Sequence, residues 1–91
     1  MVRPLTCRNI NFNPHVIYYK PAGVPMNKLD EVILELDEVE ALKLSDVDNL
    51  KQEEASKKME ISQSTFFRIL SKARKKLADA IINGKAIKIN N

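Results

Sequence analysis

Residues 52–82 read QEEASKKMEISQSTFFRILSKARKKLADAII, in which apolar residues recur at helical spacing on both sides of a short interruption. The first part predicts a helix from Gln52 to Met59, with acids in its first turn and lysines in its last, as the helix dipole favours. Ala55 lies four residues before Met59, so both side chains should face inward. A three-residue turn follows and ends in Ser62, a good N-cap for a second helix.

The second helix carries a continuous apolar stripe with spacings of three and four. Asn83-Gly84 predicts its end, because glycine adopts the left-handed cap conformation readily. The opposite face begins with short polar side chains and becomes cationic further along, which is the order expected of a helix that enters the major groove. The pattern predicts a helix-turn-helix for nucleic acid; the alternative is an ordinary helical bundle with a solvated lysine face. The inward residues are Phe66, Ile69, Leu70, Ala73, Leu77, Ala80 and Ile81.

Eight residues on the exposed face of this helix form the predicted DNA-binding set. Residues near the helix start are expected to reach base edges, and lysines further along are expected to meet phosphate. Arg74 lies nearer the apolar stripe and is expected to pair with an acid of the preceding helices. The base-proximal residues are Ser62, Gln63, Ser64, Phe67 and Arg68. The phosphate-contacting residues are Lys72, Lys75 and Lys76.

Length and composition indicate one small globular domain. The chain has 91 residues, of which 44% are hydrophobic and 30% charged, a balance typical of a folded soluble protein. It has neither the apolar run that a membrane span needs nor a signal-peptide core, so we expect a cytoplasmic protein without membrane contact. The single cysteine, Cys7, agrees with a reducing compartment.

The net charge of +3 is distributed unevenly. Residues 28–60 contain eleven acids and five bases, whereas residues 61–91 contain seven bases and only Asp79 as an acid. This polarity predicts one basic face for a polyanion, with the acidic segment turned away from it. In the alternative reading, the acidic surface of residues 31–60 binds a protein such as RNA polymerase or another regulator.

Catalysis and metal binding find little support in the sequence. Cys7 and His15 are the only soft or imidazole side chains, and they lie in different short segments. The chain has no glycine-rich phosphate loop and too few soft ligands for a zinc site within one copy. We therefore expect no enzymatic activity, no cofactor and no metal.

The N-terminal segment, residues 1–36, is expected to be extended and rich in turns. Short strands are predicted at 9–12 and 16–20, and the prolines of residues 21–25 predict a turn or docking loop. Basic and aromatic residues alternate here, and two interpretations remain open: an arm that touches DNA, or tyrosines that cover the helical core. These residues are Arg3, Arg8, Tyr18, Tyr19 and Lys20.

Residues 31–36 are rich in strand-forming residues, and a strand is favoured over the start of a longer helix. Asp37 is predicted as the N-cap of a supporting helix that reaches about Ser45, with Glu40 completing a capping box. Inward residues of this helix are expected to be Val39, Ala41, Leu42 and Leu44, followed by a polar loop over residues 46–50. The helix-turn-helix core would then span residues 37–83.

Residues 84–91 follow that core as a short C-terminal segment. Residues 86–89 alternate between polar and apolar side chains like an edge strand. This strand is expected to pair with residues 9–12, within the chain or between two chains.

Several of these motifs together resemble a small archaeal and bacterial family of unknown function, described as predicted DNA-binding proteins. Its second half is similar to region 4 of sigma-70 factors, which implies recognition of promoter-like duplex DNA. Family members usually have Ser at the position of Lys51, Gly at that of Glu60 and a small residue at that of Phe67. The motifs are Arg3-Pro4, Cys7-Arg8, Tyr19–Pro25, Asp37–Leu42, Gln52–Ala55, Ser62–Phe66, Arg68–Leu70 and Ala73–Lys76.

The expected fold is mainly α: a core of three helices with a sigma-70 region 4-like helix-turn-helix, and short β-strands from the N- and C-terminal segments. The expected function is sequence-preferring binding of duplex DNA in transcription regulation, with residues 62–83 as the recognition helix. A homodimer is expected, because the apolar stripe runs on through Leu77, Ala80, Ile81 and Ile82 beyond what two helices can cover. RNA is the remaining alternative partner.

Overall fold

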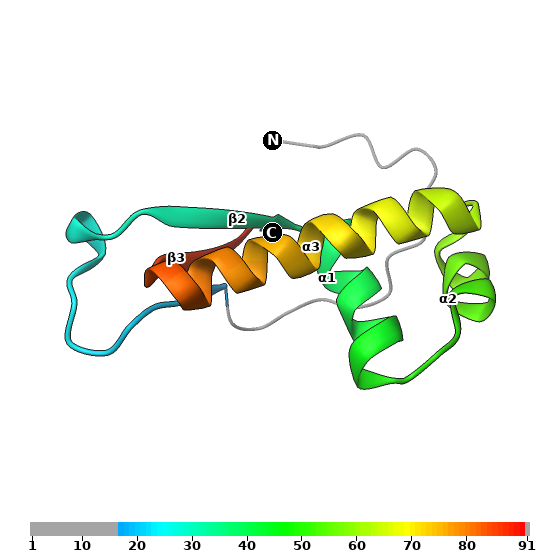
Figure 1. The fold of residues 1–91 in the computed structure, drawn as a ribbon, viewed down its shortest axis with the longest axis horizontal. Coiled ribbons are helices and arrows are strands. Elements are labelled where there is room, and N and C mark those ends of the chain that lie inside the picture. Colours follow the sequence, from blue (N-terminus) through cyan, green and yellow to red (C-terminus); the bar gives the residue numbers. More distant parts are fainter. Residues whose placement is uncertain (1–16, 91) are drawn as a thin grey trace.

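The structure, a computed structural model, describes residues 17–90, which form three α-helices and a small mixed sheet, as predicted (Figure 1). The longest helix, α3, runs along the molecule; the sheet lies beside its C-terminal half, and α1 and α2 lie beside its N-terminal half. In chain order the elements are β1 (Tyr18–Tyr19), the 3-10 turn η1 (Met26–Lys28), β2 (Glu31–Glu35), α1 (Leu36–Leu42), the π-helical turn η2 (Lys43–Val47), α2 (Gln52–Met59), α3 (Gln63–Asn83) and β3 (Ala86–Asn90).

The sheet joins three segments that are far apart in the sequence. β3 lies in the middle, antiparallel to β1 with Tyr18 opposite Lys88, and parallel to β2 with Ile33 opposite Lys88. The prediction of an edge strand at 86–89 was therefore wrong, because β3 has a neighbouring strand on each side. The Lys88 Nζ lies over the Tyr18 ring of the neighbouring strand, 5.8 Å from the centroid. The predicted strand at 9–12 lies outside the described residues.

The start of α1 differs from the prediction. Its N-cap is Glu35 rather than Asp37, and the capping box is completed by Glu38 rather than Glu40. The Glu35 N–H donates to Glu38 Oε1 at 2.8 Å. The physical reason is that β2 passes directly into α1 without a loop, so the first helical turn begins earlier. Asp37 and Glu40 are buried instead of capping the helix.

Beyond α1 the chain continues as the π-helical turn η2 before it becomes a loop. The predicted polar loop from Asp46 was therefore placed too early. Leu44, on η2, is buried together with Val39 and Ala41, as expected, whereas Leu42 is only partly buried.

Two apolar clusters hold α3 against the rest of the chain. The larger one lies where α1, η2, α2 and α3 meet, and includes Ala55 and Met59, both fully buried as predicted. The smaller one joins α3 to α1 and the sheet. Members of the larger cluster are Ala41, Leu44, Ala55, Met59, Phe66, Ile69 and Leu70. Members of the smaller cluster are Leu34, Val39, Ala73 and Ile89.

The turn between α2 and α3 ends in Ser62, as predicted. Glu60 ends α2 in the left-handed conformation with a φ of 59°. Half-buried Ile61 packs against the larger cluster. Ser62 Oγ accepts a hydrogen bond from the Thr65 N–H at 3.1 Å, so Ser62 is the N-cap of α3. Gly84 ends α3 with a φ of 66°, again as predicted.

The apolar stripe of α3 is confirmed except at its end. Ala80 is buried, but Ile81, which was placed on the same stripe, is 74% exposed. Each helical residue is rotated by about 100° from the one before it, so Ala80 and Ile81 face different sides of the last turn. Periodicity alone cannot predict which residues of this turn another element covers.

We predict that Glu60→Gly raises the free energy of unfolding by about 0.4–1 kcal/mol, because glycine adopts a positive φ without the steric cost of a Cβ atom. The greater freedom of glycine in the unfolded chain offsets part of that gain. Urea denaturation of both proteins measures the difference.

Glu60→Ala is the matched control, since it removes the carboxylate and keeps the Cβ atom. It should give no comparable gain. A fall in stability for Glu60→Gly would show that the steric cost of the Cβ atom at a positive φ does not destabilise the turn.

Candidate nucleic-acid interface

The start of α3 is fixed by a small group of hydroxyls. Ser62 Oγ lies 2.9 Å from Thr65 Oγ1 and 3.2 Å from Ser64 Oγ, in addition to capping the helix. Ser62, Gln63 and Ser64 are nevertheless all exposed. These side chains therefore present donors and acceptors to solvent from a rigid helix end, which is the property that base-edge contacts require.

Phe67 and Arg68 lie one turn further along on the exposed side of α3. The Phe67 side chain is 52% exposed, whereas its neighbour Phe66 is fully buried in the core. Arg68 donates only a long hydrogen bond of 3.4 Å, to Thr65 Oγ1, and has no ion pair within residues 17–90. The five predicted base-proximal residues thus occupy one continuous exposed surface at the beginning of α3.

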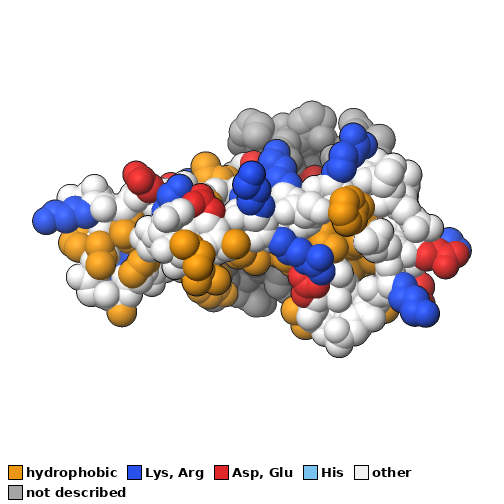
Figure 2. Space-filling view, in the orientation of Figure 1, with side chains coloured by type: hydrophobic (Ala, Val, Ile, Leu, Met, Phe, Trp, Pro, Cys, Tyr) orange, Lys and Arg blue, Asp and Glu red, His pale blue; other side chains and the backbone are white. Residues whose placement is uncertain are grey.

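Lys72 and Lys75 continue this surface with unpaired positive charge. Both are exposed, and neither has a hydrogen-bond or ion-pair partner in the described part of the chain. They line a shallow groove along α3 together with Lys76 and Asp79. Figure 2 shows basic side chains distributed along α3 on the face drawn there.

Lys76 has a different environment from the other two predicted phosphate contacts. Its Nζ lies 2.8 Å from Glu38 Oε1 and also donates to the carbonyl oxygen of Ile33. The side chains of Lys76 and Glu38 are 24% and 4% exposed, respectively. This ammonium therefore links α3 to α1 and β2. The periodicity of the sequence did not predict these interactions.

Arg74 forms an ion pair with an acidic residue, as predicted. Its Nε donates to Asp46 Oδ2 at 3.1 Å, and its Nη2 donates to Asp46 Oδ1. The guanidinium holds the pKa of the Asp46 carboxyl below its usual range, and the same bonds raise the pKa of Arg74. A lowered carboxyl pKa means that this link contributes stability at neutral pH and loses it as the pH falls through the folded-state pKa.

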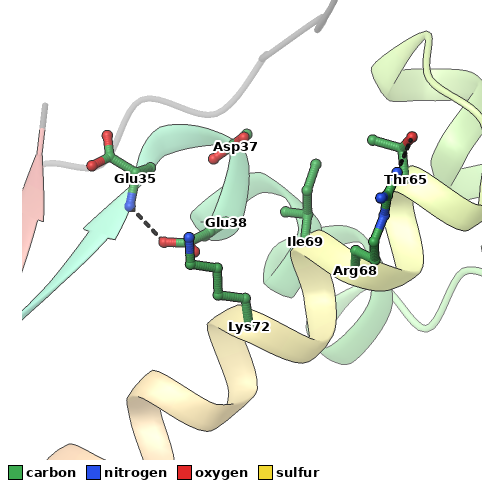
Figure 3. A pocket seen from close by; sticks show the side chains of 7 residues that line it. All are labelled: Glu35, Asp37, Glu38, Thr65, Arg68, Ile69 and Lys72. Carbon is green, nitrogen blue, oxygen red and sulfur yellow. Dashed lines mark hydrogen bonds between the residues drawn. The ribbon is translucent and has the colours of Figure 1, made fainter.

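A cleft separates the N-terminus of α1 from the exposed flank of α3 (Figure 3). Carboxylates form one wall and cationic side chains the other, with Ile69 between them. The uneven charge predicted that the acidic segment turns away from the basic face. That prediction was wrong, because part of the segment faces α3 directly. The reason is that the buried sides of α1 and α3 pack together, which brings the charged side chains beside those buried sides close to one another. The lining residues are Glu35, Asp37, Glu38, Thr65, Arg68, Ile69 and Lys72.

The tyrosines of the N-terminal segment lie at the other end of α3. Tyr18 and Tyr19 form β1, and Tyr19 borders a shallow depression with Ile81 and Gly84. Tyr18 and Tyr19 are 41% and 54% exposed; neither belongs to the two apolar clusters or to the exposed surface around Phe67. The other residues of the predicted arm, Arg3 and Arg8, and the candidate ligands Cys7 and His15, lie outside the described residues.

Two further features bear on the earlier expectations. No helix in residues 17–90 is long and apolar enough to cross a bilayer. In the same residues, no group of three His, Cys, Asp or Glu side chains is placed to hold a metal ion.

Removing the Lys76 ammonium should destabilise the fold. Lys76→Ala leaves the buried Glu38 carboxylate without its cation, and we predict a loss of about 1–3 kcal/mol in the free energy of unfolding. Lys75→Ala, the adjacent exposed lysine, is the control and should change stability by no more than about 0.5 kcal/mol. Equal effects of the two variants in chemical denaturation would show that the pair with Glu38 contributes little.

Comparison with known proteins places these features in a family. Residues 1–91 match the family model described as "Protein of unknown function DUF134". A UPF0251 protein of Thermoanaerobacter pseudethanolicus is 52% identical over 89 residues, covering 98% of this chain and 75% of the relative. A UPF0251 protein of Moorella thermoacetica is 49% identical over 89 residues, covering 98% of this chain and 60% of the relative. No solved structure matches the chain.

Proposed function

The chain belongs to the DUF134 family of proteins of unknown function, and from its own surface we propose that it binds duplex DNA with sequence preference and regulates transcription. In this proposal α2 and α3 act as a helix-turn-helix, and α3 is the recognition helix. The observation that carries the proposal is the exposed start of α3, where a capped polar turn, Phe67 and Arg68 precede two unpaired lysines.

The chemistry along α3 divides into two parts. Gln63, Ser64 and Arg68 can hydrogen bond to base edges, and the Phe67 ring can contact a thymine methyl group. Lys72 and Lys75 lie about one to two turns beyond Arg68, where a helix that enters the groove by its N-terminus comes close to the phosphate backbone. Lys76 is left out of this set, because Glu38 and Ile33 already hold its ammonium.

The carboxylate wall of the cleft between α1 and α3 limits the side from which DNA phosphate can approach. Phosphate that approached Arg68 from the α1 side would meet the carboxylates of Glu35 and Asp37, which line the same cleft. We therefore expect the phosphate backbone of DNA to pass on the Lys75 side of α3, with the Arg68 side chain directed at the bases.

Two alternative partners fit the surface less well. The acidic segment has fewer free charges than its composition suggests, since Glu38 and Asp46 pair with α3 and Asp48 pairs with Lys43. This weakens the reading as an adaptor for RNA polymerase or another regulator. Single-stranded RNA usually binds on several exposed aromatic rings, whereas Phe67 is the only aromatic ring exposed on the proposed face in the described residues.

We predict that Arg68→Ala weakens binding to a selected duplex by roughly 1–3 kcal/mol, the cost of one bidentate base contact. Binding to random-sequence duplex should weaken much less. Filter binding or fluorescence anisotropy on both duplexes measures the difference. Equal losses on both would mean that Arg68 contacts phosphate rather than bases.

Lys75→Ala should differ from Arg68→Ala in its effect on the two duplexes. It is expected to weaken binding to selected and random duplex alike and to reduce the slope of log affinity against log salt by about one. Lys76→Ala is the matched control, and its slope should equal that of the unmodified protein after correction for the folded fraction. The proposal fails if the unmodified protein binds neither duplex at low salt.

A further inference from the structure

Of the two aromatic side chains of α3, only Phe67 faces solvent. It is 52% exposed, whereas the adjacent Phe66 is fully buried in the larger apolar cluster. The exposed residues one turn before and after Phe67 are polar, and two of the three are serines, whose side chains are much shorter than a phenyl ring. These residues are Gln63, Ser64 and Ser71. The Phe67 ring therefore projects beyond the serines around it and is not part of the core.

The chemistry of this ring limits what it can recognise on DNA. A phenyl group has no conventional hydrogen-bond donor or acceptor, so it cannot read the polar groups of a base edge. The apolar group that a base presents in the major groove is the C5 methyl group of thymine. 5-Methylcytosine carries the same methyl group at the same ring position, whereas cytosine and uracil lack it. Phe67 can therefore detect the methyl group but cannot distinguish the two bases that carry it.

Arg68 places a hydrogen-bonding side chain next to this ring. The two residues are adjacent, so they differ by about 1.5 Å along the helix axis, which is less than the 3.4 Å between successive base pairs. Arg68 has no ion pair within residues 17–90, and guanine is the base that arginine contacts most often. The two side chains can therefore contact the same base pair or two neighbouring ones.

We propose that α3 recognises the C5 methyl group of a pyrimidine next to a guanine, and that it accepts 5-methylcytosine in place of thymine. This inference rests on the proposed function, since it requires α3 to enter the major groove of duplex DNA. Phe67 is the residue that senses the methyl group. Its consequence is regulation by DNA modification, because methylation of a cytosine at this position converts a weak site into a preferred one.

The first experiment removes the methyl group from thymine. A preferred site is selected from a random-sequence duplex library, and each of its thymines is replaced singly by deoxyuridine, which lacks only that group. Fluorescence anisotropy should find a thymine next to a guanine at which the replacement weakens binding of the unmodified protein about fourfold, the affinity equivalent of one buried methyl group. Phe67→Ser should bind the thymine and deoxyuridine duplexes equally.

Arg68→Ala is the matched control, because it removes the neighbouring contact and keeps the ring. It should bind both duplexes more weakly and retain the fourfold difference between thymine and deoxyuridine. Both positions are exposed, so circular dichroism and urea denaturation should show that both variants remain folded.

The second experiment adds the methyl group to cytosine. The sensitive thymine–adenine pair is replaced by cytosine–guanine, with and without a C5 methyl group on the cytosine. The unmodified protein should bind the methylated duplex about fourfold more tightly than the unmethylated one, and Phe67→Ser should bind both alike.

The possible failures of this inference and of the proposed function differ. A selected site in which deoxyuridine weakens binding at no thymine, or equal binding of the methylated and unmethylated duplexes, would overturn the inference and leave sequence-preferring DNA binding intact. Tighter binding by Phe67→Ser would also overturn it, because the ring would then obstruct the groove. A protein that enriches no sequence would overturn the proposed function, and this inference with it.

Discussion

One buried carboxylate connects the three parts of this fold. Glu38 accepts from the Glu35 N–H at the junction of β2 and α1, and its charge is balanced by Lys76 of α3. The same ammonium donates to the Ile33 carbonyl oxygen in β2. A carboxylate that is 4% exposed needs such partners, because an unpaired buried charge is strongly destabilising. The position of α3 relative to the sheet and to α1 depends on this arrangement.

Once α3 is held there, its two sides have separate roles. Phe66 and Ala73, both fully buried, belong to the side that packs against α1, α2 and the sheet. The opposite side is free for most of its length, and it changes from polar at Ser64 to cationic at Lys75 to apolar at Ile82. A long helix anchored along one side can therefore present distinct surfaces at its two ends.

The acidic segment supplies charge within the molecule as well as at its surface. Glu38 and Asp46 each pair with a basic side chain of α3, so part of the charge asymmetry between the two segments is cancelled by the fold. The cations of α3 that have no ion pair within residues 17–90 are Arg68, Lys72 and Lys75, and all three are exposed. Folding has thus limited the unpaired positive charge of α3 to part of the bases that its sequence contains.

Local patterns determined much of this structure. The α2–α3 pair, the Ser62 cap and the Gly84 stop followed from helical periodicity and capping preferences, because these depend on residues within a few positions of one another. The family resemblance was likewise carried by short motifs along nearly the whole chain. The exposed positions of Ser62, Gln63, Ser64, Phe67 and Arg68 were predictable for the same reason.

Tertiary structure decided what involves distant segments. The central place of β3, the start of α1 at Glu35 and the exposure of Ile81 depend on which elements become neighbours, and periodicity contains no information about that. The different fates of Lys75 and Lys76 show this most clearly: adjacent lysines on one helix are equivalent in sequence, but only one of them lies beside a buried carboxylate contributed from 38 positions away.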